Sequence, residues 1–213
     1  MYSFSDKTQK IALIGSGYWG TILLNSLIKL NFKNILVHDK NQNNVSILKK
    51  KFKQIIILNN FKEILLDEKI KNIFVATPPS ENYEIVRKLI IYKKNIFLEK
   101  PGFSNLEEII KIEKLLKKSK SKLMFGYIYC YNNHINEIKK ILKQNKLGKL
   151  LYISFNRQNL GPIRSDVDVD YDLTSHDLSI INKFFGMLPS VKSYKKYFIL
   201  KKNIADISNL HLS

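Results

Sequence analysis

The sequence predicts an α/β protein with a doubly wound parallel sheet, followed by an incomplete α+β domain with a mostly antiparallel open sheet. Three observations lead to this fold class. Short apolar runs alternate with amphipathic stretches over the first 126 residues, a glycine-rich turn follows the first run, and the pattern changes beyond residue 126. Strict alternation of strand and helix is typical of a parallel sheet covered on both faces.

The strands of the first domain are predicted from compact runs rich in β-branched and aromatic residues, each bounded by polar residues or turn signals. Helices are predicted where apolar residues recur with helical spacing between these runs. The predicted strands are residues 10–15, 34–39, 54–58, 71–77, 95–100 and 122–126, and the predicted helices are residues 19–31, 43–52, 81–92 and 105–118.

A second domain is expected over residues 127–213, after a nucleotide-binding domain over residues 1–126. It begins with a predicted helix around 132–145. Residues 150–161 alternate like a strand with one solvated or ligand-facing side. Residues 190–200 and 204–213 alternate like two antiparallel strands. The last of these runs reaches the end of the sequence without a turn signal, so we expect an unfinished sheet with exposed edges.

Composition narrows the class of protein. The net charge is +18, but 33 of the 36 basic residues are lysines, and they are scattered rather than gathered on one stripe. We interpret this charge as a solvated surface and expect no nucleic-acid partner. A single cysteine, the absence of a signal-peptide pattern and the lack of a membrane-length apolar run predict a cytoplasmic protein with no membrane partner. Cysteine and histidine spacing predicts no metal site.

The turn "GSGYWG" has the G-x-G-x-x-G spacing at Gly15, Gly17 and Gly20, between a predicted strand and a predicted helix. This context is typical of dinucleotide binding, with the pyrophosphate at the helix N-terminus. Asp39 ends the next strand, where a carboxylate accepts hydrogen bonds from ribose hydroxyls and repels a 2′-phosphate. NAD is therefore expected rather than NADP, although the adjacent Lys40 could soften that preference.

Two further segments contain candidate catalytic groups. Lys100 lies in "FLEKPG", at the carboxyl end of a predicted strand, where ligands bind in open α/β sheets. In "DYDLTSHDLSIINKFFG", Asp172 and His176 are four residues apart, so a helix would place them on one face. This spacing alone fits either a catalytic pair or a polar helix start.

The motifs together resemble one family. "IALIGSGYWG", "VATPPSENYE", "FLEKP" and "YDLTSHDLSIINKFFG" follow the order typical of the glucose–fructose oxidoreductase / inositol dehydrogenase / MocA family of NAD(P)-dependent sugar dehydrogenases. The resemblance implies a Rossmann fold and catalytic roles for Lys100, Asp172 and His176 on a substrate hydroxyl. The cofactor-binding residues then predicted are Gly15, Gly17, Tyr18, Trp19, Gly20, Asp39, Thr77, Pro78, Glu99 and Lys100.

Substrate contacts are predicted less directly. Arg157 and Arg164 could bind a carboxylate or phosphate through the planar guanidinium fork, or form structural salt bridges. Asp177 could cap a helix or bind a substrate hydroxyl. Tyr131, Asn132 and Asn159 complete the predicted sugar-contacting set.

The resemblance also implies a reaction, hydride transfer between nicotinamide and a secondary hydroxyl of a sugar or nucleotide-sugar in surface-polysaccharide metabolism. An imidazole titrates near neutrality and suits the base, while a lysine ammonium stabilises the developing oxyanion. Asn82 stands where histidine is common in the family, and members usually continue well beyond residue 213, so we expect a truncated chain. The alternatives are a nucleotide-binding protein without turnover and an inositol or simple-sugar dehydrogenase. A homo-oligomer is possible.

Overall fold

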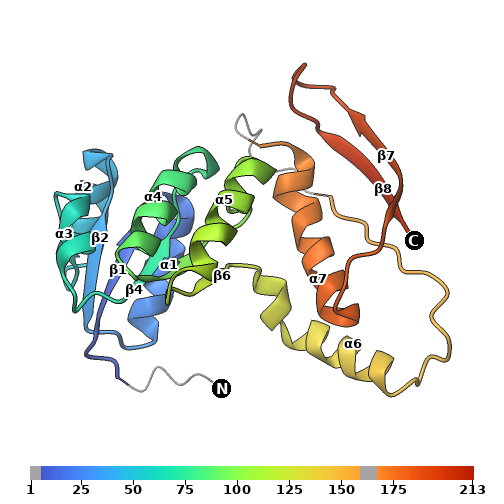
Figure 1. The fold of residues 1–213 in the computed structure, drawn as a ribbon, viewed down its shortest axis with the longest axis horizontal. Helices are drawn as coiled ribbons and strands as arrows, with labels where there is room; N and C mark the ends of the chain where they lie inside the picture. The colour runs from blue at the N-terminus through green and yellow to red at the C-terminus, as the bar shows by residue number, and fades with distance from the viewer. Residues whose placement is uncertain (1–5, 159–166) are drawn as a thin grey trace. The chain divides into compact units, whose positions relative to one another are not determined.

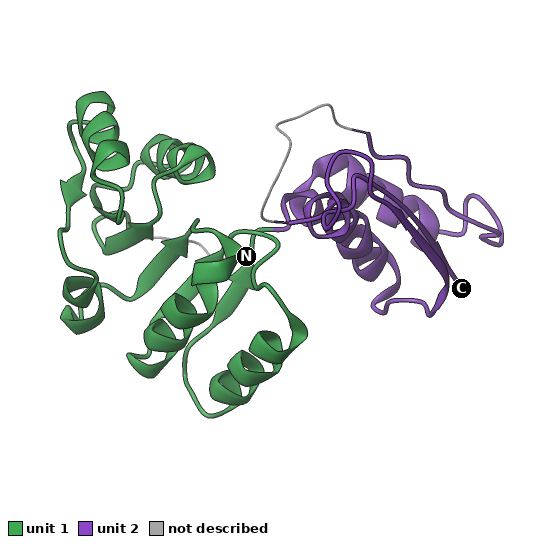
Figure 2. Cartoon of the chain, turned by 90° about the horizontal axis from the view of Figure 1, so that it is seen from above, with its two compact units in different colours: residues 1–126 green, residues 127–213 purple. Residues whose placement is uncertain are grey.

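The computed structural model describes residues 6–158 and 167–213. The chain forms two compact units, one ending at Gly126 and one running from Tyr127 to Ser213 (Figure 2).

The first unit alternates strands and helices along the chain (Figure 1). Its elements are β1 (Lys10–Ile14), α1 (Tyr18–Lys29), β2 (Asn34–His38), α2 (Gln42–Lys51), β3 (Ile56–Ile57), α3 (Phe61–Leu66), β4 (Asn72–Val75), α4 (Pro79–Ile91), β5 (Asn95–Leu98), α5 (Leu106–Lys117) and β6 (Leu123–Phe125).

The six strands form one sheet in the order β3-β2-β1-β4-β5-β6, and every neighbouring pair is parallel. This is the strand order of a Rossmann fold, and it confirms the predicted fold class. The order reverses between β1 and β4, so the crevice at their carboxyl ends is the place where such sheets bind ligands.

Both faces of the sheet are buried, as the apolar strands require. Ile11 and Leu13 of β1 point into a cluster with residues of α1 and α2, including Leu24 and Leu48. Their neighbours Ala12 and Ile14 point into a second cluster with residues of α3, α4 and α5. Successive side chains of a strand alternate between faces, so β1 contributes to both cores.

Several helices begin at an asparagine that caps them. The side chain of Asn41 accepts a hydrogen bond at the start of α2, and Asn105 does so for α5. Asn60 and Glu63 form a reciprocal capping box at α3. This short helix was absent from the sequence-based prediction, although the cap is a recognisable start signal.

The second unit contains η1 (Ile128–Tyr131), α6 (Asn133–Lys143), η2 (Asp170–Thr174), α7 (Ser175–Phe185), β7 (Val191–Tyr197) and β8 (Ile207–Leu212). The two strands pair antiparallel, with Tyr194 opposite Leu210. The hairpin and the helix around 132–145 agree with the expectation from sequence.

The predicted strand over 150–161 was wrong for its described part. Residues 151–158 form no strand, and Leu151 and Tyr152 are 85% and 83% exposed. Alternating polarity indicates a surface that could pair, but strand formation also needs a neighbouring strand with matching register. The described residues contain no helix long and apolar enough to cross a membrane.

Candidate active site

The glycine turn between β1 and α1 has a different steric requirement at each glycine. Gly15 has φ +88°, and a Cβ there would lie 2.7 Å from the carbonyl oxygen of Ala76. A Cβ at Gly20 would lie 2.0 Å from the carbonyl oxygen of Gly15. Gly17 faces open space, because no residue beyond its own neighbours in the chain has an atom within 4 Å of its Cβ position. Two glycines are thus required by packing, and the third leaves a space beside the helix start.

Tyr18 and Trp19 begin α1 and remain exposed, at 77% and 43%. Their rings contact each other edge to face, with centroids 5.6 Å apart. Gly17 caps the helix without a side chain, so the first backbone N–H groups of α1 keep no side-chain partner at the cap. A helix N-terminus of this kind favours an anion such as a pyrophosphate.

Asp39 lies directly after β2 and contacts the glycine turn. Its Oδ2 accepts hydrogen bonds from the Ser16 backbone N–H at 2.6 Å and the Ser16 hydroxyl at 2.7 Å. Its Oδ1 accepts one from the Asn41 N–H at 2.8 Å. Partial burial of the carboxyl opposes ionisation, but the hydrogen bonds from Asn41 and Ser16 prevail and hold the pKa of Asp39 below its usual value.

These features fit a dinucleotide. The open space at Gly17 and the start of α1 suit a pyrophosphate, and the ionised Asp39 suits ribose hydroxyls rather than a 2′-phosphate. Lys40, which could attract such a phosphate, is paired with Glu81 at 2.8 Å. The surroundings of Asp39 therefore favour NAD.

The loop after β4 holds Thr77 and Pro78. The Thr77 hydroxyl donates a hydrogen bond of 2.6 Å to the side-chain oxygen of Asn82, in the first turns of α4. The Asn82 amide donates in turn to the carbonyl of Gly102 at 2.5 Å, and Asn82 is 1% exposed. The loops after β4 and β5 are thus joined by one buried side chain.

Glu99 and Lys100 follow β5 at the same edge of the sheet, as predicted, and Lys100 precedes a cis peptide bond to Pro101. Burial raises the pKa of Glu99, although the backbone N–H and charge of Lys100 act in the opposite direction. A Cβ at Gly126 would lie 3.1 Å from the Glu99 carboxyl carbon. Glu99 therefore packs closely against the end of β6.

In the second unit, Asp172 and His176 lie on one continuous helical segment. Asp172 belongs to η2, a π-helical turn, and His176 is the second residue of α7. A helix with both residues on one face was considered from the sequence, but its wider first turn was not, and such π-helical turns are frequent at functional sites. His176 is buried at 8% exposure, and its ring meets the Tyr129 ring edge to face at 5.0 Å.

Arg157 lies in the same region and forms an ion pair. Its guanidinium donates to both carboxylate oxygens of Asp177, with a shortest distance of 2.6 Å. It also donates to the Tyr129 hydroxyl at 3.2 Å and stacks over that ring. Of the two alternatives predicted for Arg157, ligand binding and a structural salt bridge, the structure contains the salt bridge. Asp177 follows His176 directly, so the ion pair and Tyr129 both border the histidine.

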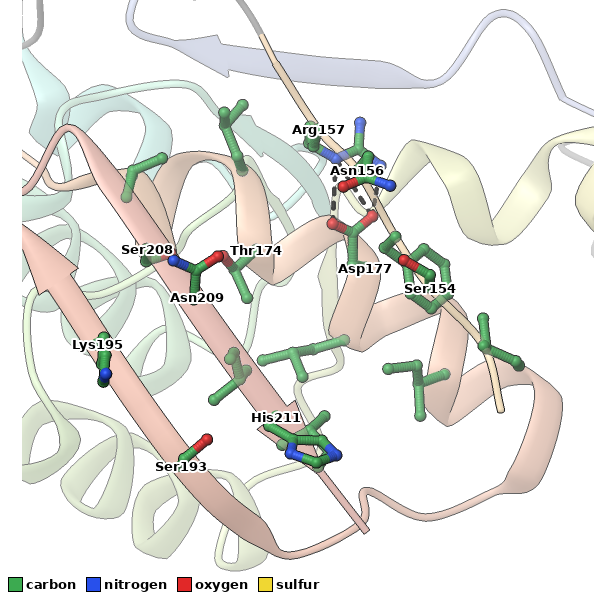
Figure 3. Close-up of a pocket in the computed structure, with 18 of the residues that line it drawn as sticks. Ser154, Asn156, Arg157, Thr174, Asp177, Ser193, Lys195, Ser208, Asn209 and His211 are labelled. Atoms are coloured by element: carbon green, nitrogen blue, oxygen red, sulfur yellow. Dashed lines mark hydrogen bonds and ion pairs between the residues drawn. The ribbon is translucent and has the colours of Figure 1, made fainter. Parts of the chain in front are cut away.

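A cavity of about 1990 Å³ lies within the second unit (Figure 3). Arg157 and Asp177 lie on one side of it, while Ser193, Lys195 and Asn209 come from the hairpin. Asp172 also lines it. Ligand pockets usually measure about 300–1,000 Å³, so this hollow exceeds what a sugar alone would fill.

The other predicted substrate contacts have mixed outcomes. The side chain of Asn132 caps α6 by accepting from His134 and Ile135 N–H groups. Tyr131 is 65% exposed. Asn159 and Arg164 lie outside the described residues. Substrate roles for these four residues stay predictions. In the part of the chain that the structure describes, no group of three or more Cys, His, Asp or Glu residues could hold a metal ion.

Two residues at the site, Ser16 and Tyr129, were not singled out from the sequence, and Asn82 was noted there only as a departure from the histidine common in the family. Ser16 orients Asp39, Asn82 joins two loops, and Tyr129 contacts both Arg157 and His176. Ser16 could have been found, since it lies inside the glycine motif. Asn82 and Tyr129 act through partners distant in sequence, which no local pattern indicates.

Comparison with known proteins agrees with this geometry. Residues 9–127 match the oxidoreductase family with an NAD-binding Rossmann fold, the family of glucose–fructose oxidoreductase, inositol dehydrogenase and MocA. The chain belongs to this family. NAD is accordingly the cofactor of the first unit, and the predicted family membership is confirmed.

The chain is similar to several curated proteins. It is 24% identical to an uncharacterized oxidoreductase of Bacillus subtilis, over 61% of this chain and 40% of the relative. It is 21% identical to the myo-inositol 2-dehydrogenase of Thermotoga maritima, over 83% of this chain and 55% of the relative. The chain thus spans about two fifths to just over half of these relatives.

Solved structures show the same fold. GenD2 from gentamicin A biosynthesis, in complex with NAD, superposes with a TM-score of 0.82 at 15% identity, covering 99% of this chain and 64% of GenD2. Myo-inositol 2-dehydrogenase from Lactobacillus plantarum gives 0.73 at 18% identity, covering 89% and 60%.

Proposed function

We propose that this chain is the cofactor-binding and base-carrying part of an NAD-dependent dehydrogenase that oxidises a secondary hydroxyl of a sugar or nucleotide-sugar. The observation that carries the proposal is the position of Lys100 two residues after β5, at the edge of the sheet where the glycine turn and Asp39 also lie. A lysine there adjoins the nucleotide crevice of a Rossmann sheet.

Lys100, Asp172 and His176 are assigned to one reaction. NAD, when bound, supplies the nicotinamide ring that accepts the hydride. The imidazole of His176 removes the proton from the substrate oxygen as the hydride leaves the adjacent carbon. The ammonium group of Lys100 stabilises the negative charge that develops on that oxygen. Asp172, four residues before His176, orients the imidazole and stabilises its charged form.

The substrate class is supported by the names of relatives. Two are inositol dehydrogenases, and a relative 26% identical over 65% of this chain is the 2,7-anhydro-N-acetylneuraminate hydratase of Escherichia coli. Inositol and 2,7-anhydro-N-acetylneuraminate, the compounds in these names, are both cyclic polyhydroxy compounds. Surface-polysaccharide metabolism is the pathway we propose, from the family resemblance of the sequence.

The test begins with thermal melts of the chain alone, with NADH and with NADPH, followed by NAD reduction with a panel of sugars, inositols and nucleotide-sugars. NADH should raise the melting temperature more than NADPH. Lys100→Ala and His176→Gln should each lower kcat by about 10²–10⁴-fold. The matched controls are Lys114→Ala and His134→Gln, because both side chains are exposed and lie outside the proposed site.

Two outcomes would decide against the proposal. Unchanged turnover in both Lys100→Ala and His176→Gln would remove these residues from the reaction. NADH binding without turnover of any compound in the panel would leave a nucleotide-binding protein instead of a dehydrogenase.

A further inference from the structure

Asn82 connects two loops that carry predicted cofactor-binding residues. Its side-chain oxygen accepts from the Thr77 hydroxyl at 2.6 Å, and its amide nitrogen donates to the Gly102 carbonyl at 2.5 Å. Thr77 comes just after β4, and Gly102 comes two residues after Lys100. One buried amide therefore spans the carboxyl ends of two neighbouring strands.

Few side chains can do this. The position requires an acceptor for Thr77 and a donor for the Gly102 carbonyl, and a primary amide offers both within one small group. An apolar side chain provides neither, and an ionised carboxylate provides only acceptors. Because Asn82 is 1% exposed, water cannot readily replace a lost partner.

The second loop is also held on its other side. Gly102 has φ +93°, and a Cβ there would lie 2.5 Å from the Phe125 ring. The next residue, Phe103, is 1% exposed and packs edge to face on the same ring. The loop that carries Lys100 is thus fixed between β6 and the amide of Asn82.

We propose that Asn82 is a positioning residue that holds the Thr77 loop and the Lys100 loop at a fixed separation, so that the nicotinamide half of NAD binds between defined partners. A Rossmann sheet consists of two mononucleotide-binding halves. Asn82 acts on the half formed by β4, β5 and β6, whereas Asp39 and the glycine turn serve the other half. The role in binding rests on NAD as cofactor, and any effect on turnover rests on the proposed function.

The test compares two ligands by titration calorimetry. NADH occupies both halves of the site, and ADP lacks the nicotinamide half. Asn82→Leu keeps the approximate shape of the side chain and removes both hydrogen bonds. Asn133→Leu is the matched control, since Asn133 is an exposed asparagine at the start of α6. Circular dichroism at the titration temperature verifies that each variant is folded.

We expect Asn82→Leu to weaken NADH binding by about tenfold, the effect of losing buried hydrogen bonds, and to change ADP binding by less than about twofold. The control should change neither affinity. Equal weakening of both ligands would show a purely structural role and overturn the proposal, as would unchanged NADH binding.

Thr77→Val provides a second test if Asn82→Leu fails to fold. It removes one of the two hydrogen bonds without a change of shape, and we expect NADH binding to weaken by about three- to fivefold with ADP unaffected. In the double variant the losses should be smaller than their sum, because both substitutions break the same contact. Strict additivity would overturn the proposal.

This experiment is separable from the test of turnover. Calorimetry needs no substrate, so a chain without dehydrogenase activity can still confirm the role of Asn82. Wild-type protein that binds ADP but not NADH would overturn the positioning role. If the chain only lacks turnover with every compound tested, the dehydrogenase proposal fails, but both titrations should still give the expected results.

Discussion

Asp39 accepts hydrogen bonds from Ser16 and Asn41 within its own chain. Each carboxylate oxygen has more than one acceptor site, so ribose hydroxyls can bind to a carboxylate whose orientation is already fixed. This arrangement lowers the entropy that is lost on binding. The sequence predicted the carboxylate and its ligand class, but the role of Ser16 emerged only from the geometry.

Asp39→Asn should weaken NADH binding by about tenfold and reduce the preference for NADH over NADPH. The amide is a poorer acceptor for ribose hydroxyls, and it no longer repels a 2′-phosphate. Paired calorimetric titrations with both nucleotides check this. A variant that retained the wild-type preference would show that another group selects the cofactor.

Asp39 should also contribute to acid sensitivity. Its pKa is lowered in the folded chain, so its contribution to the free energy of unfolding is present above about pH 3.9, the usual aspartate value. That contribution is lost as the pH falls through the folded-state pKa. Urea unfolding of wild type and Asp39→Asn at pH values from about 6 to 3 should give a stability difference that shrinks toward low pH. A constant difference would contradict the linkage.

The Arg157–Asp177 ion pair is largely buried, since the two side chains are only 24% and 14% exposed. Arg157→Met leaves the Asp177 carboxylate without its partner and should lower the free energy of unfolding of the full chain by about 1–3 kcal/mol. Lys140→Met breaks the exposed ion pair with Glu137. It should change the free energy of unfolding by less than about 0.5 kcal/mol. Urea unfolding followed by circular dichroism measures both. Equal effects would mean that burial does not strengthen the Arg157 pair.

At the scale of elements, the sequence predicted the helices and strands whose local residue pattern agrees with their tertiary environment. The strands β1, β2, β4, β5 and β6 were found within two residues, because strands buried on both faces read as short apolar runs. Helix α3 has six residues and too few turns for a periodic signal. Residues 151–158 have strand-like alternation but no partner strand, which local pattern cannot reveal.

The glycine turn provides a matched pair of substitutions. Gly20→Ala forces a Cβ against the Gly15 carbonyl and should destabilise the first unit by about 2–3 kcal/mol. Gly17→Ala meets open space and should leave the melting temperature nearly unchanged. It should nevertheless weaken NADH binding by about tenfold, since the new methyl group occupies the space assigned to the pyrophosphate. Thermal melts with and without NADH distinguish the two effects. Unchanged NADH binding in Gly17→Ala would place the pyrophosphate elsewhere.

At the scale of the whole chain, the buried apolar core belongs almost entirely to the first unit. Among the described residues, the apolar side chains buried in the second unit are Ile180 and Ala205. The second unit instead exposes large apolar side chains along residues 150–153, 185–188 and 197–200. Hydrophobic burial is the main favourable contribution to folding, so the two units should differ greatly in their independent stability.

A fragment ending at Gly126 should therefore melt cooperatively and bind NADH and ADP with affinities within about threefold of the full chain. It retains the complete six-stranded sheet, the glycine turn, Asp39 and the Asn82 contact. The complementary fragment beginning at Tyr127 should show no cooperative transition, because it buries too little apolar surface to offset its conformational entropy. Calorimetric melts of both fragments give the answer. A cooperative melt of the second fragment would show that this unit folds independently and would contradict the prediction. A first fragment that unfolds or loses ADP binding would show that the first unit depends on the second.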